Sequence, residues 1–538
     1  MKIDGWIHGE QIGSIIGETS PIQALFIVEN RGIRPKLGEY VVIDYGPDTP
    51  LRERYVLGMI ESIYSGNPLA PGDLDNPYAI PKLRVYDETR RRTYLRGVIR
   101  LLSYISTILP RSGIPIVEAP KTPPPPLSLV YRASSNLLRK VFSERGHEWI
   151  RIGVLASHPD VPYSVNVNYI VQRHLAILAV TGAGKSNAVA LLVSRIVDKL
   201  NGTVLVFDMH SEYASSNLGV RTNVIQPLLN PLHLDISEFL QLVRIPSNAW
   251  RQEYILRSAL ESVKKAIINK DALPKDFFDE LKQDIELLIT NPRKSRIKVS
   301  GRVSEWQKAA SSVLNKIDDL LFRYGSIFSF TVSKDLKSII RPGYLNIMDL
   351  GGVDEDTADV VVHHYLRRLY YERKRYIREK NGYPDPILVV LEEAHVLVPR
   401  NEDRLTKYWV SRLAREGRKF GIGLCLVSQR PKVIDENALS QTNNKIILKL
   451  VEPNDLRYVQ YASEYLSDEL LKILPGLNIG EAVVLGLMTP LPAIVKIDIC
   501  PGKSGGRDIN AVTEWSRRKS LAEEAKELIK EEIDIAGL

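Results

Sequence analysis

One stretch of the chain constrains its fold more than any other: HLAILAVTGAGKSNAVALLVSRIVDKL, which runs from residue 174 to 200. It starts as a continuous apolar run, passes through a short turn that contains glycine, and continues with apolar residues at helical spacing. A strand that enters a helix through such a turn points backbone N–H groups and the helix N-terminus at phosphate oxygens. The stretch therefore predicts an α/β core that binds a nucleotide through a P-loop.

The turn departs from the strict pattern G-x-x-x-x-G-K-S/T at one position, because Ala179 stands where the first glycine is expected. We expect Ala179 at the exit of the strand, where a negative φ accommodates its methyl group. Lys185 is expected to reach the β- and γ-phosphates of ATP, and Ser186 to place its hydroxyl on Mg²⁺. The predicted nucleotide-binding residues are Thr181, Gly182, Ala183, Gly184, Lys185, Ser186 and Asn187.

Apolar runs alternate with longer helical patterns through the rest of this region. The runs that follow the P-loop are TVLVFDM, YLNIMDL, ILVVLEE, GIGLCLVSQ and KIILKLV. Such runs are typical of parallel strands that are buried on both faces, so we predict a core with a parallel sheet over residues 151–500. Between about 234 and 325 the apolar spacing of three and four predicts an inserted helical subdomain.

The residues on either side of this core have a different character. Residues 1–115 contain short β-branched and aromatic runs, which predict an all-β barrel. Its expected strands are QALFIVE, YVVIDYG, RYVLGMIESI, KLRVYDE and TYLRGVIRLL. In residues 116–150, PKTPPPPLSLV predicts a stiff extended linker and LLRKVFSERG a short helix. Residues 501–538 end in SLAEEAKELIKEEIDIAGL, which predicts an amphipathic helical tail.

Composition narrows the cellular context. Apolar residues make up 44% and charged residues 25% of the chain, and no apolar run approaches the ~18 residues of a membrane helix. The N-terminus has no apolar signal region, and Cys425 and Cys500 are too few for a disulfide framework or a zinc cluster. We therefore expect a cytoplasmic protein without a membrane partner, and the net charge of +8 favours a polyanionic one.

Carboxylates at the ends of predicted strands supply the expected chemistry. ILVVLEE ends in Glu392 and Glu393, and because neighbouring strand residues point to opposite faces, one can approach Mg²⁺ while the other activates water. Asp208 ends the strand in FDMHSEY. Gln429 ends the strand in GLCLVSQRP, where its amide can sense the γ-phosphate or orient water. These residues predict ATP hydrolysis at the carboxyl edge of the sheet.

The chain resembles the HerA branch of the FtsK–HerA family of hexameric DNA-pumping ATPases. The resemblance is carried by TPPPPLSLVY, RHLAILAVTGAGKSN, FDMHSEY, VVLEEAH and REGRKFGIGLCLVSQRP. It implies a RecA-like core in a homo-hexameric ring around double-stranded DNA, with ATP and Mg²⁺ at subunit boundaries. By this resemblance Glu393 is the catalytic carboxylate, Glu392 and Asp208 support the metal and water, Arg418 is an arginine finger, and Arg173 is a second arginine at the nucleotide.

The resemblance also implies partners. A NurA-type nuclease would dock on the barrel face, and a break-processing nuclease complex would join them in DNA end resection and recombinational repair. Two alternatives remain at this point. One is a secretion or conjugation ATPase of the same superfamily, and the other is a non-motor ring that serves as a scaffold for a nuclease.

Overall fold

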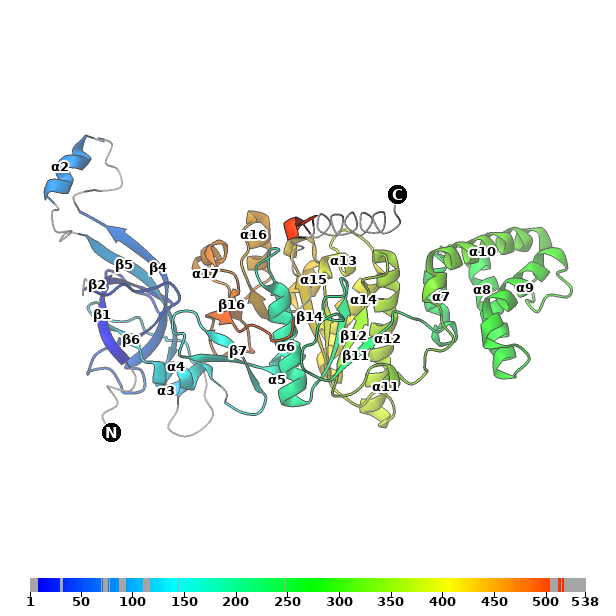
Figure 1. Cartoon of the computed structure of the whole chain (residues 1–538), viewed down its shortest axis with the longest axis horizontal. Helices are drawn as coiled ribbons and strands as arrows, with labels where there is room; N and C mark the ends of the chain where they lie inside the picture. The colour runs from blue at the N-terminus through cyan, green and yellow to red at the C-terminus, as the bar shows by residue number, and fades with distance from the viewer. Residues whose placement is uncertain are drawn as a thin grey trace, which may run out of the picture.

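The computed structural model describes residues 8–29, 32–68, 70, 76, 78–86, 93–109, 117–143, 145–246, 248–503, 511–513 and 515–516. The molecule is elongated, with a strand barrel at one end, a broad sheet with helices in the middle and a helical subdomain at the other end (Figure 1). The tail helix expected over residues 520–538 lies outside the described residues. Within the described residues, none of the helices is both long and apolar enough to span a membrane.

The N-terminal part is a closed barrel with the strand order β1-β2-β5-β4-β3-β6. Its strands are β1 His8–Ile16, β2 Gln23–Val28, β3 Tyr40–Asp44, β4 Tyr55–Gly66, β5 Tyr94–Tyr104 and β6 Leu129–Ala133. Apolar side chains such as Phe26, Val41 and Ile60 fill its interior. Closure leaves no unpaired edge, which explains why such a small sheet can be stable without a second sheet packed on it.

The structure corrects three predictions about this region. KLRVYDE is not a strand, because its described residues belong to the helix α2 Ala79–Tyr86. The barrel does not end at residue 115, because β6 follows the proline run and pairs with both β1 and β3. The proline run is therefore not a linker between domains: Thr19 Oγ1 donates to the Pro124 carbonyl (2.8 Å) and Tyr45 OH to the Thr122 carbonyl (3.2 Å), which hold the run against the barrel.

The core contains an 11-stranded sheet with the order β11-β12-β10-β13-β14-β9-β15-β16-β17-β7-β8. The strands from β11 to β15 pair in parallel. Their bounds are β9 Leu175–Leu178, β10 Thr203–Asp208, β11 Thr222–Ile225, β12 Leu345–Asp349, β13 Ile387–Leu391, β14 Ile422–Ser428 and β15 Asn444–Ile447. The six predicted core strands are confirmed, and β9, β10, β13, β14 and β15 are buried throughout.

The sheet is mixed rather than purely parallel. Four further strands extend it in antiparallel pairing beyond β15: β16 Glu481–Leu485, β17 Ala493–Ile497, β7 Trp149–Leu155 and β8 Pro162–Asn166. Sequence reasoning did not foresee this extension, because an apolar run records burial and not strand direction. The barrel contacts this extension, because Tyr40 OH of β3 donates to the Pro492 carbonyl next to β17 at 2.6 Å. The Tyr40 ring also lies 5.0 Å from the ring of Phe142.

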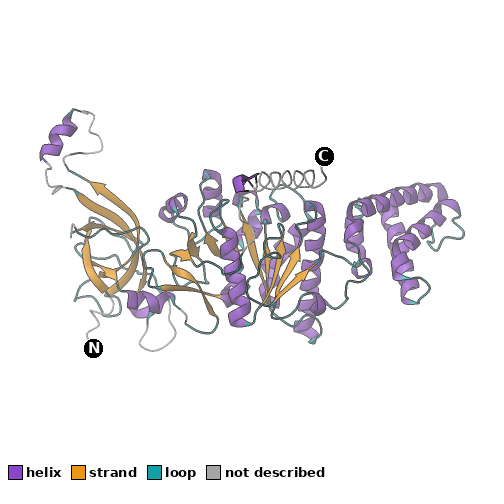
Figure 2. Cartoon of the chain, in the orientation of Figure 1, coloured by secondary structure: helices purple, strands orange, loops and turns teal. Residues whose placement is uncertain are grey.

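Helices cover the sheet and form the subdomain at the end opposite the barrel (Figure 2). The helices of the core are α5 Val167–Arg173, α6 Lys185–Leu200, α11 Leu336–Ile339, α12 Glu355–Glu379, α13 Ala394–Leu397, α14 Leu405–Glu416, α15 Glu436–Ser440, α16 Pro453–Tyr461 and α17 Asp468–Ile473. Two short helices lie beside the barrel: α3 Ile105–Ile108 packs on β4 and β5, and α4 Ser135–Phe142 connects β6 of the barrel to β7 of the core sheet. The helix α4 confirms the helix predicted at LLRKVFSERG.

The predicted inserted helical subdomain is confirmed, and it lies between β11 and β12 with four helices as its main elements. They are α7 Ile236–Leu242, α8 Trp250–Ile268, α9 Phe277–Thr290 and α10 Val303–Tyr324. A capping box starts the insertion, because the Asp235 side chain accepts from the Glu238 N–H while the Glu238 side chain accepts from the Asp235 N–H. This reciprocal pair satisfies two N–H groups that the first turn leaves without helical partners.

Candidate functional site

The P-loop connects β9 to α6 with the backbone that the sequence predicts. Gly182 has φ +78° and Gly184 has φ +101°, a left-handed conformation that only glycine adopts without strain. Ala179 is buried, its φ is not positive, and its N–H donates to the Ser428 carbonyl at 3.2 Å. The position of the replaced glycine therefore belongs to the strand ladder, where a methyl group fits.

Lys185 meets both predicted carboxylates at the carboxyl edge of the sheet. Its Nζ lies 2.5 Å from Glu393 Oε1 and 3.6 Å from Glu392 Oε2. The meeting follows from the topology, since only β14 separates the P-loop strand β9 from β13, and parallel neighbours end at the same edge. Lys185 is thus held among carboxylates at the mouth of the phosphate-binding turn.

The backbone at Glu393 differs from the prediction of two carboxylates on opposite faces of a strand. The strand β13 ends at Leu391, and Glu393 adopts a left-handed conformation with φ +46° and ψ +48° before α13 begins. This turn brings both carboxylates to Lys185. A non-glycine residue in this region costs of order 1–3 kcal/mol, and such strain is concentrated at functional sites.

Among the residues that the structure describes, none forms a hydrogen bond with one oxygen of Glu393. Glu393 Oε2 is buried and accepts no hydrogen bond from the described residues, although His395 Nδ1 lies 3.2 Å away. Burial lowers the pKa of His395, so its imidazole is neutral at neutral pH and does not form an ion pair with Glu393. Glu393 therefore carries a free, buried oxygen that can accept a proton from a water molecule.

Glu392 is more tightly engaged. Tyr213 donates its hydroxyl to Glu392 Oε1. Burial raises the pKa of Glu392, and the neighbouring Lys185 opposes that rise. Both oxygens of Glu392 thus have partners within the protein, one in Tyr213 and one in Lys185, whereas Glu393 keeps one oxygen open.

Asp208 shapes the loop that brings Tyr213 to the site. It accepts backbone N–H groups of Glu212 (3.1 Å), Tyr213 (2.8 Å) and Ala214 (3.0 Å). Burial raises the pKa of Asp208, and these backbone hydrogen bonds oppose the rise. Because the loop occupies both of its oxygens, Asp208 acts on the site through Glu212 and Tyr213.

Lys503 also reaches this cluster from the far end of the chain. Its Nζ lies 3.1 Å from Glu212 Oε2 and 5.5 Å from the centre of the Tyr213 ring, and its side chain is only 10% exposed. Burial acts to raise the pKa of Glu212, but Lys503 and the Ser186 hydroxyl outweigh burial and the pKa is lowered. Sequence reasoning missed Tyr213, although it ends the FDMHSEY stretch, and it missed Lys503, which no local pattern marks.

Gln429 joins the P-loop directly. Thr181 Oγ1 donates to Gln429 Oε1 at 2.6 Å, which links the turn after β9 to the end of the neighbouring strand β14. Thr181 and Gln429, both predicted from the sequence to belong to the site, thus contact each other. The amide of Gln429 lies on the same side of β9 as Glu393, because β14 and β13 follow β9 in that direction.

The two predicted arginines do not join the site of their own chain. Arg173 ends α5 before β9, and Arg418 lies exposed in the short 3-10 helix η4 Gly417–Phe420 before β14. Both therefore lie at the amino edge of the sheet, and the P-loop lies at the carboxyl edge. The seven residues of β14 separate the two edges by roughly 20 Å. Neither arginine can reach the P-loop that its own chain provides.

His174 holds together the backbone segments near Arg173 and Arg418. Its Nε2 donates to the Ala414 carbonyl at 3.0 Å, and its Nδ1 accepts the Leu424 N–H at 3.0 Å. Burial lowers the pKa of His174 to about 4, although the hydrogen bond to the Ala414 carbonyl acts to raise it, so the ring is neutral. The start of β9, the end of α14 and β14 are thereby held together.

The oxygen donors at the carboxyl edge fit Mg²⁺. The Ser186 hydroxyl and the carboxylates of Glu392 and Glu212 are hard oxygen ligands, which Mg²⁺ prefers. Mg²⁺ in nucleotide sites usually takes one or two protein ligands together with phosphate oxygens and water. In the described part of the chain no three His, Cys, Asp or Glu residues form a dedicated metal cage, and a nucleotide-borne Mg²⁺ requires none.

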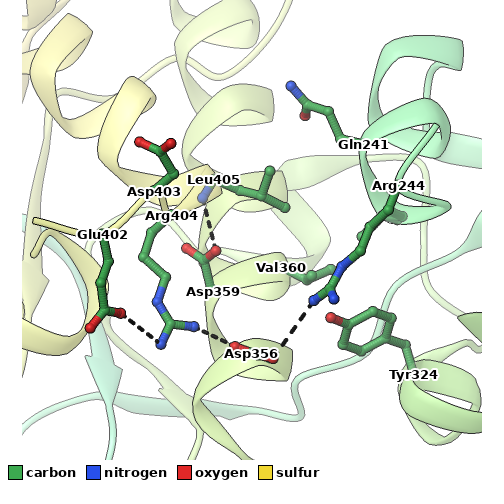
Figure 3. A pocket seen from close by; sticks show the side chains of 11 residues that line it. Gln241, Arg244, Tyr324, Asp356, Asp359, Val360, Glu402, Asp403, Arg404 and Leu405 are labelled. Atoms are coloured by element: carbon green, nitrogen blue, oxygen red, sulfur yellow. Dashed lines mark hydrogen bonds and ion pairs between the residues drawn. The ribbon is translucent and has the colours of Figure 1, made fainter. Parts of the chain in front are cut away.

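A separate cavity of about 590 Å³ lies where the inserted subdomain meets the core. In Figure 3, Arg404 and Arg244 both point at Asp356, at Nη–Oδ distances of 2.5 Å and 3.8 Å. The Leu405 N–H donates to Asp359 at 2.8 Å. These ion pairs join the end of α7, the start of α12 and the start of α14, so the cavity belongs to the anchorage of the subdomain and not to the P-loop.

The strand order around the P-loop, the paired carboxylates after β13 and the polar end of β14 define a RecA-like P-loop ATPase. The comparisons specify it further. The family "Helicase HerA, central domain" matches residues 150–369, and "HAS barrel domain" matches residues 12–101. The chain belongs to the HerA helicase family, and it is an ATP-driven enzyme.

Individual relatives match over nearly the whole chain. The "DNA double-strand break repair helicase HerA" of Sulfolobus acidocaldarius is 39% identical over 510 residues, which cover 94% of this chain and 97% of the relative. The protein of the same name from Saccharolobus solfataricus is 38% identical over 531 residues, or 96% and 97% of the two chains. Among solved structures, "Plasmid coupling protein TrwB in complex with ADP and Mg2+" has a TM-score of 0.46 at 16% identity, covering 70% of this chain and 93% of TrwB.

Proposed function

We propose that this chain is an ATP-driven motor that moves along double-stranded DNA as a homo-hexameric ring. One observation carries the proposal: Lys185 and Glu393 lie at the carboxyl edge of the sheet, and Arg173 and Arg418 lie at the amino edge. A hydrolytic site completed by these arginines needs the amino edge of a second copy. A head-to-tail contact of this kind generates closed rings when its rotation closes.

Within one subunit, we assign roles by what each side chain contacts. Lys185 and the turn from Thr181 to Asn187 bind the phosphates of ATP, and Ser186 with Glu392 holds Mg²⁺, which neutralises phosphate charge when bound. Glu393 takes the proton of the attacking water on its free Oε2. Gln429, which Thr181 already contacts, orients this water against the γ-phosphate.

Across the subunit boundary, Arg418 acts as an arginine finger and Arg173 as a second arginine at the nucleotide. Arg418 is exposed, as a residue that enters a neighbour's site must be. An arginine supplied in trans stabilises transition-state charge and is worth ~10³–10⁵ in turnover. Because Arg418 of one subunit contacts the nucleotide of the next, it also couples ATP hydrolysis between neighbouring subunits of the ring.

The biological task is DNA end resection in recombinational repair. The relatives are named as DNA double-strand break repair helicases, and the net charge of +8 suits a polyanionic track that is held through its phosphates. No motif in the sequence indicates a nuclease, so we propose that a NurA-type nuclease docks on the barrel face and cooperates with a break-processing nuclease complex. This task places the protein in the cytoplasm.

The first test is ATP hydrolysis with and without linear double-stranded DNA, together with displacement of a triplex-forming strand. Stimulation by DNA and ATP-dependent displacement support the motor, with Lys185→Ala as the inactive control. Hydrolysis that ignores DNA would favour a secretion or conjugation ATPase. No hydrolysis, even with a nuclease partner present, would favour a scaffold ring.

A mixing experiment tests the site between subunits. Arg418→Ala and Glu393→Gln are each expected to be inactive alone. Rings assembled from both recover activity, because some boundaries combine an intact Glu393 with an intact Arg418 from the neighbour. Mixed rings that stay as inactive as each parent contradict a site shared between subunits.

A further inference from the structure

Two large apolar side chains are exposed beside the nucleotide-binding turn. Ile479 is 71% exposed and Ile499 is 86% exposed. Ile479 directly precedes Gly480, whose N–H donates to the Ala183 carbonyl in the P-loop at 3.0 Å. The segment that carries Ile479 is therefore attached to the phosphate-binding turn by a backbone hydrogen bond.

Ile499 is attached to the first turn of α6 in a similar way. Asn187 Nδ2 donates to the carbonyl of Asp498 at 2.9 Å, and Asn187 Oδ1 accepts the N–H of Cys500 at 2.8 Å. Ile499 lies between these two pinned residues. The two segments are also joined to each other, since the Ile497 N–H donates to the Gly480 carbonyl at 2.8 Å. Ile479 and Ile499 thus flank one end of the P-loop.

The topology shows which part of a nucleotide faces them. Glu393 and Gln429, which act on the γ-phosphate, follow β13 and β14 on one side of β9. The two isoleucines flank the ends of β16 and β17, on the other side of β9. A triphosphate with its γ-phosphate at Glu393 carries its nucleoside at the opposite end, toward Ile479 and Ile499.

The polar side chains of these two segments are already paired within the protein. Asp498 forms ion pairs with Arg151 and Arg195, both at 3.1 Å. Asn478 Nδ2 donates to Glu481 Oε2 at 2.9 Å. Lys496 Nζ donates to the Ile479 carbonyl. A site that offers apolar contact but few free side-chain hydrogen-bond groups cannot discriminate strongly between bases.

We propose that Ile479 and Ile499 form an apolar clamp for the base of the nucleoside triphosphate held on the P-loop, and that the clamp accepts adenine and guanine nearly equally. The clamp rests on the proposed nucleotide site, but it does not depend on DNA or on movement. It holds the base through its flat apolar face, which every base possesses. It also explains why two isoleucines remain exposed in a single subunit.

The test is equilibrium binding by calorimetry in the presence of Mg²⁺, with the full chain carrying Glu393→Gln to stop hydrolysis. The ligands are ATP, GTP and tripolyphosphate, which has the three phosphates but no base. Ile479→Ala with Ile499→Ala is expected to weaken ATP and GTP about tenfold, since truncating two isoleucines removes part of their apolar contact. Tripolyphosphate is expected to bind unchanged. Ile268→Ala, at a residue that is 77% exposed at the end of α8, is the matched control.

Four results would overturn the clamp. Equal weakening of all three ligands would mean that the isoleucines support the P-loop and not the base. Unchanged ATP binding by the double variant would mean that the base lies elsewhere. Loss of the oligomer, measured by size-exclusion chromatography with light scattering, would mean the same if ATP binding is kept. Natural binding of ATP much more than tenfold tighter than GTP would overturn the expected lack of base discrimination. Because each reading uses binding without DNA, failure of the motor proposal is recognised separately.

Discussion

Replacing Glu393 by Gln is expected to slow ATP hydrolysis strongly and to tighten ATP binding. The buried Oε2 of Glu393 accepts no hydrogen bond from the described part of the chain, so it is placed to take a proton from water. A glutamine amide has nearly the same shape but cannot act as a base at neutral pH. General-base assistance contributes ~10²–10⁴-fold, and we expect kcat to fall by that factor.

The gain in binding follows from the position of Lys185. Its Nζ lies 2.5 Å from Glu393 Oε1 and 3.6 Å from Glu392 Oε2. At an effective dielectric constant of 20, the attractions of these two pairs are about 7 and about 5 kcal/mol before the opposing desolvation. Lys185 must leave Glu393 to reach the phosphates, and the carboxylate then repels the γ-phosphate. With most of these energies offset by desolvation and by Mg²⁺, we expect a net gain of about 1.4 kcal/mol, or tenfold in Kd.

Glu392→Gln is the matched control. Glu392 already accepts the Tyr213 hydroxyl and lies farther from Lys185, so its replacement should reduce kcat less than Glu393→Gln. Steady-state hydrolysis gives kcat, and calorimetric titration with ATP and Mg²⁺ gives Kd. The reasoning is refuted if Glu393→Gln keeps kcat within tenfold of the natural chain, or if both variants lose kcat equally.

Three further predictions concern the residues around this centre. Since burial lowers the pKa of His174 to about 4, its contribution to stability is complete above pH 6.5 and is lost as pH falls toward 4. The full loss of unfolding free energy amounts to about 3 kcal/mol. His174→Gln should therefore show a smaller drop in Tm between pH 7.5 and 5 than the natural chain. An equal drop would contradict this assignment. Asp208→Asn should speed hydrogen exchange of the loop after β10 and lower kcat, because one of the two oxygens that accept its three N–H groups becomes an NH2 that cannot accept. Unchanged exchange would argue against a positioning role. Lys503→Met should raise KM for ATP several-fold, because it removes the lysine that pairs with Glu212, and Lys503→Arg should restore the natural KM. If KM is unchanged in both variants, Lys503 has no role at the site.

The sequence by itself determined the elements whose signals are local. The P-loop, the six core strands and the four helices of the insertion follow from periodicity, and Ala179 could be placed from its position at the strand exit. The gathering of Lys185, Glu393 and Gln429 at one edge of the sheet could also be predicted, because parallel strands end at a common edge and each of these residues follows such a strand. In each of these cases the signal lies within a few consecutive residues of the chain.

Only the tertiary structure decided which distant segments pair. β6 closes the barrel after a proline run that looked like a linker, and the described part of KLRVYDE belongs to the helix α2 and not to a strand of the barrel. Lys503 reaches Glu212 across 291 residues of sequence, and the amino-edge position of Arg418 appears only once β14 is placed beside β9. Strand direction, sheet closure and ion pairs over such separations depend on the packing of whole elements, and a local pattern records the burial of a residue but not the neighbour that buries it.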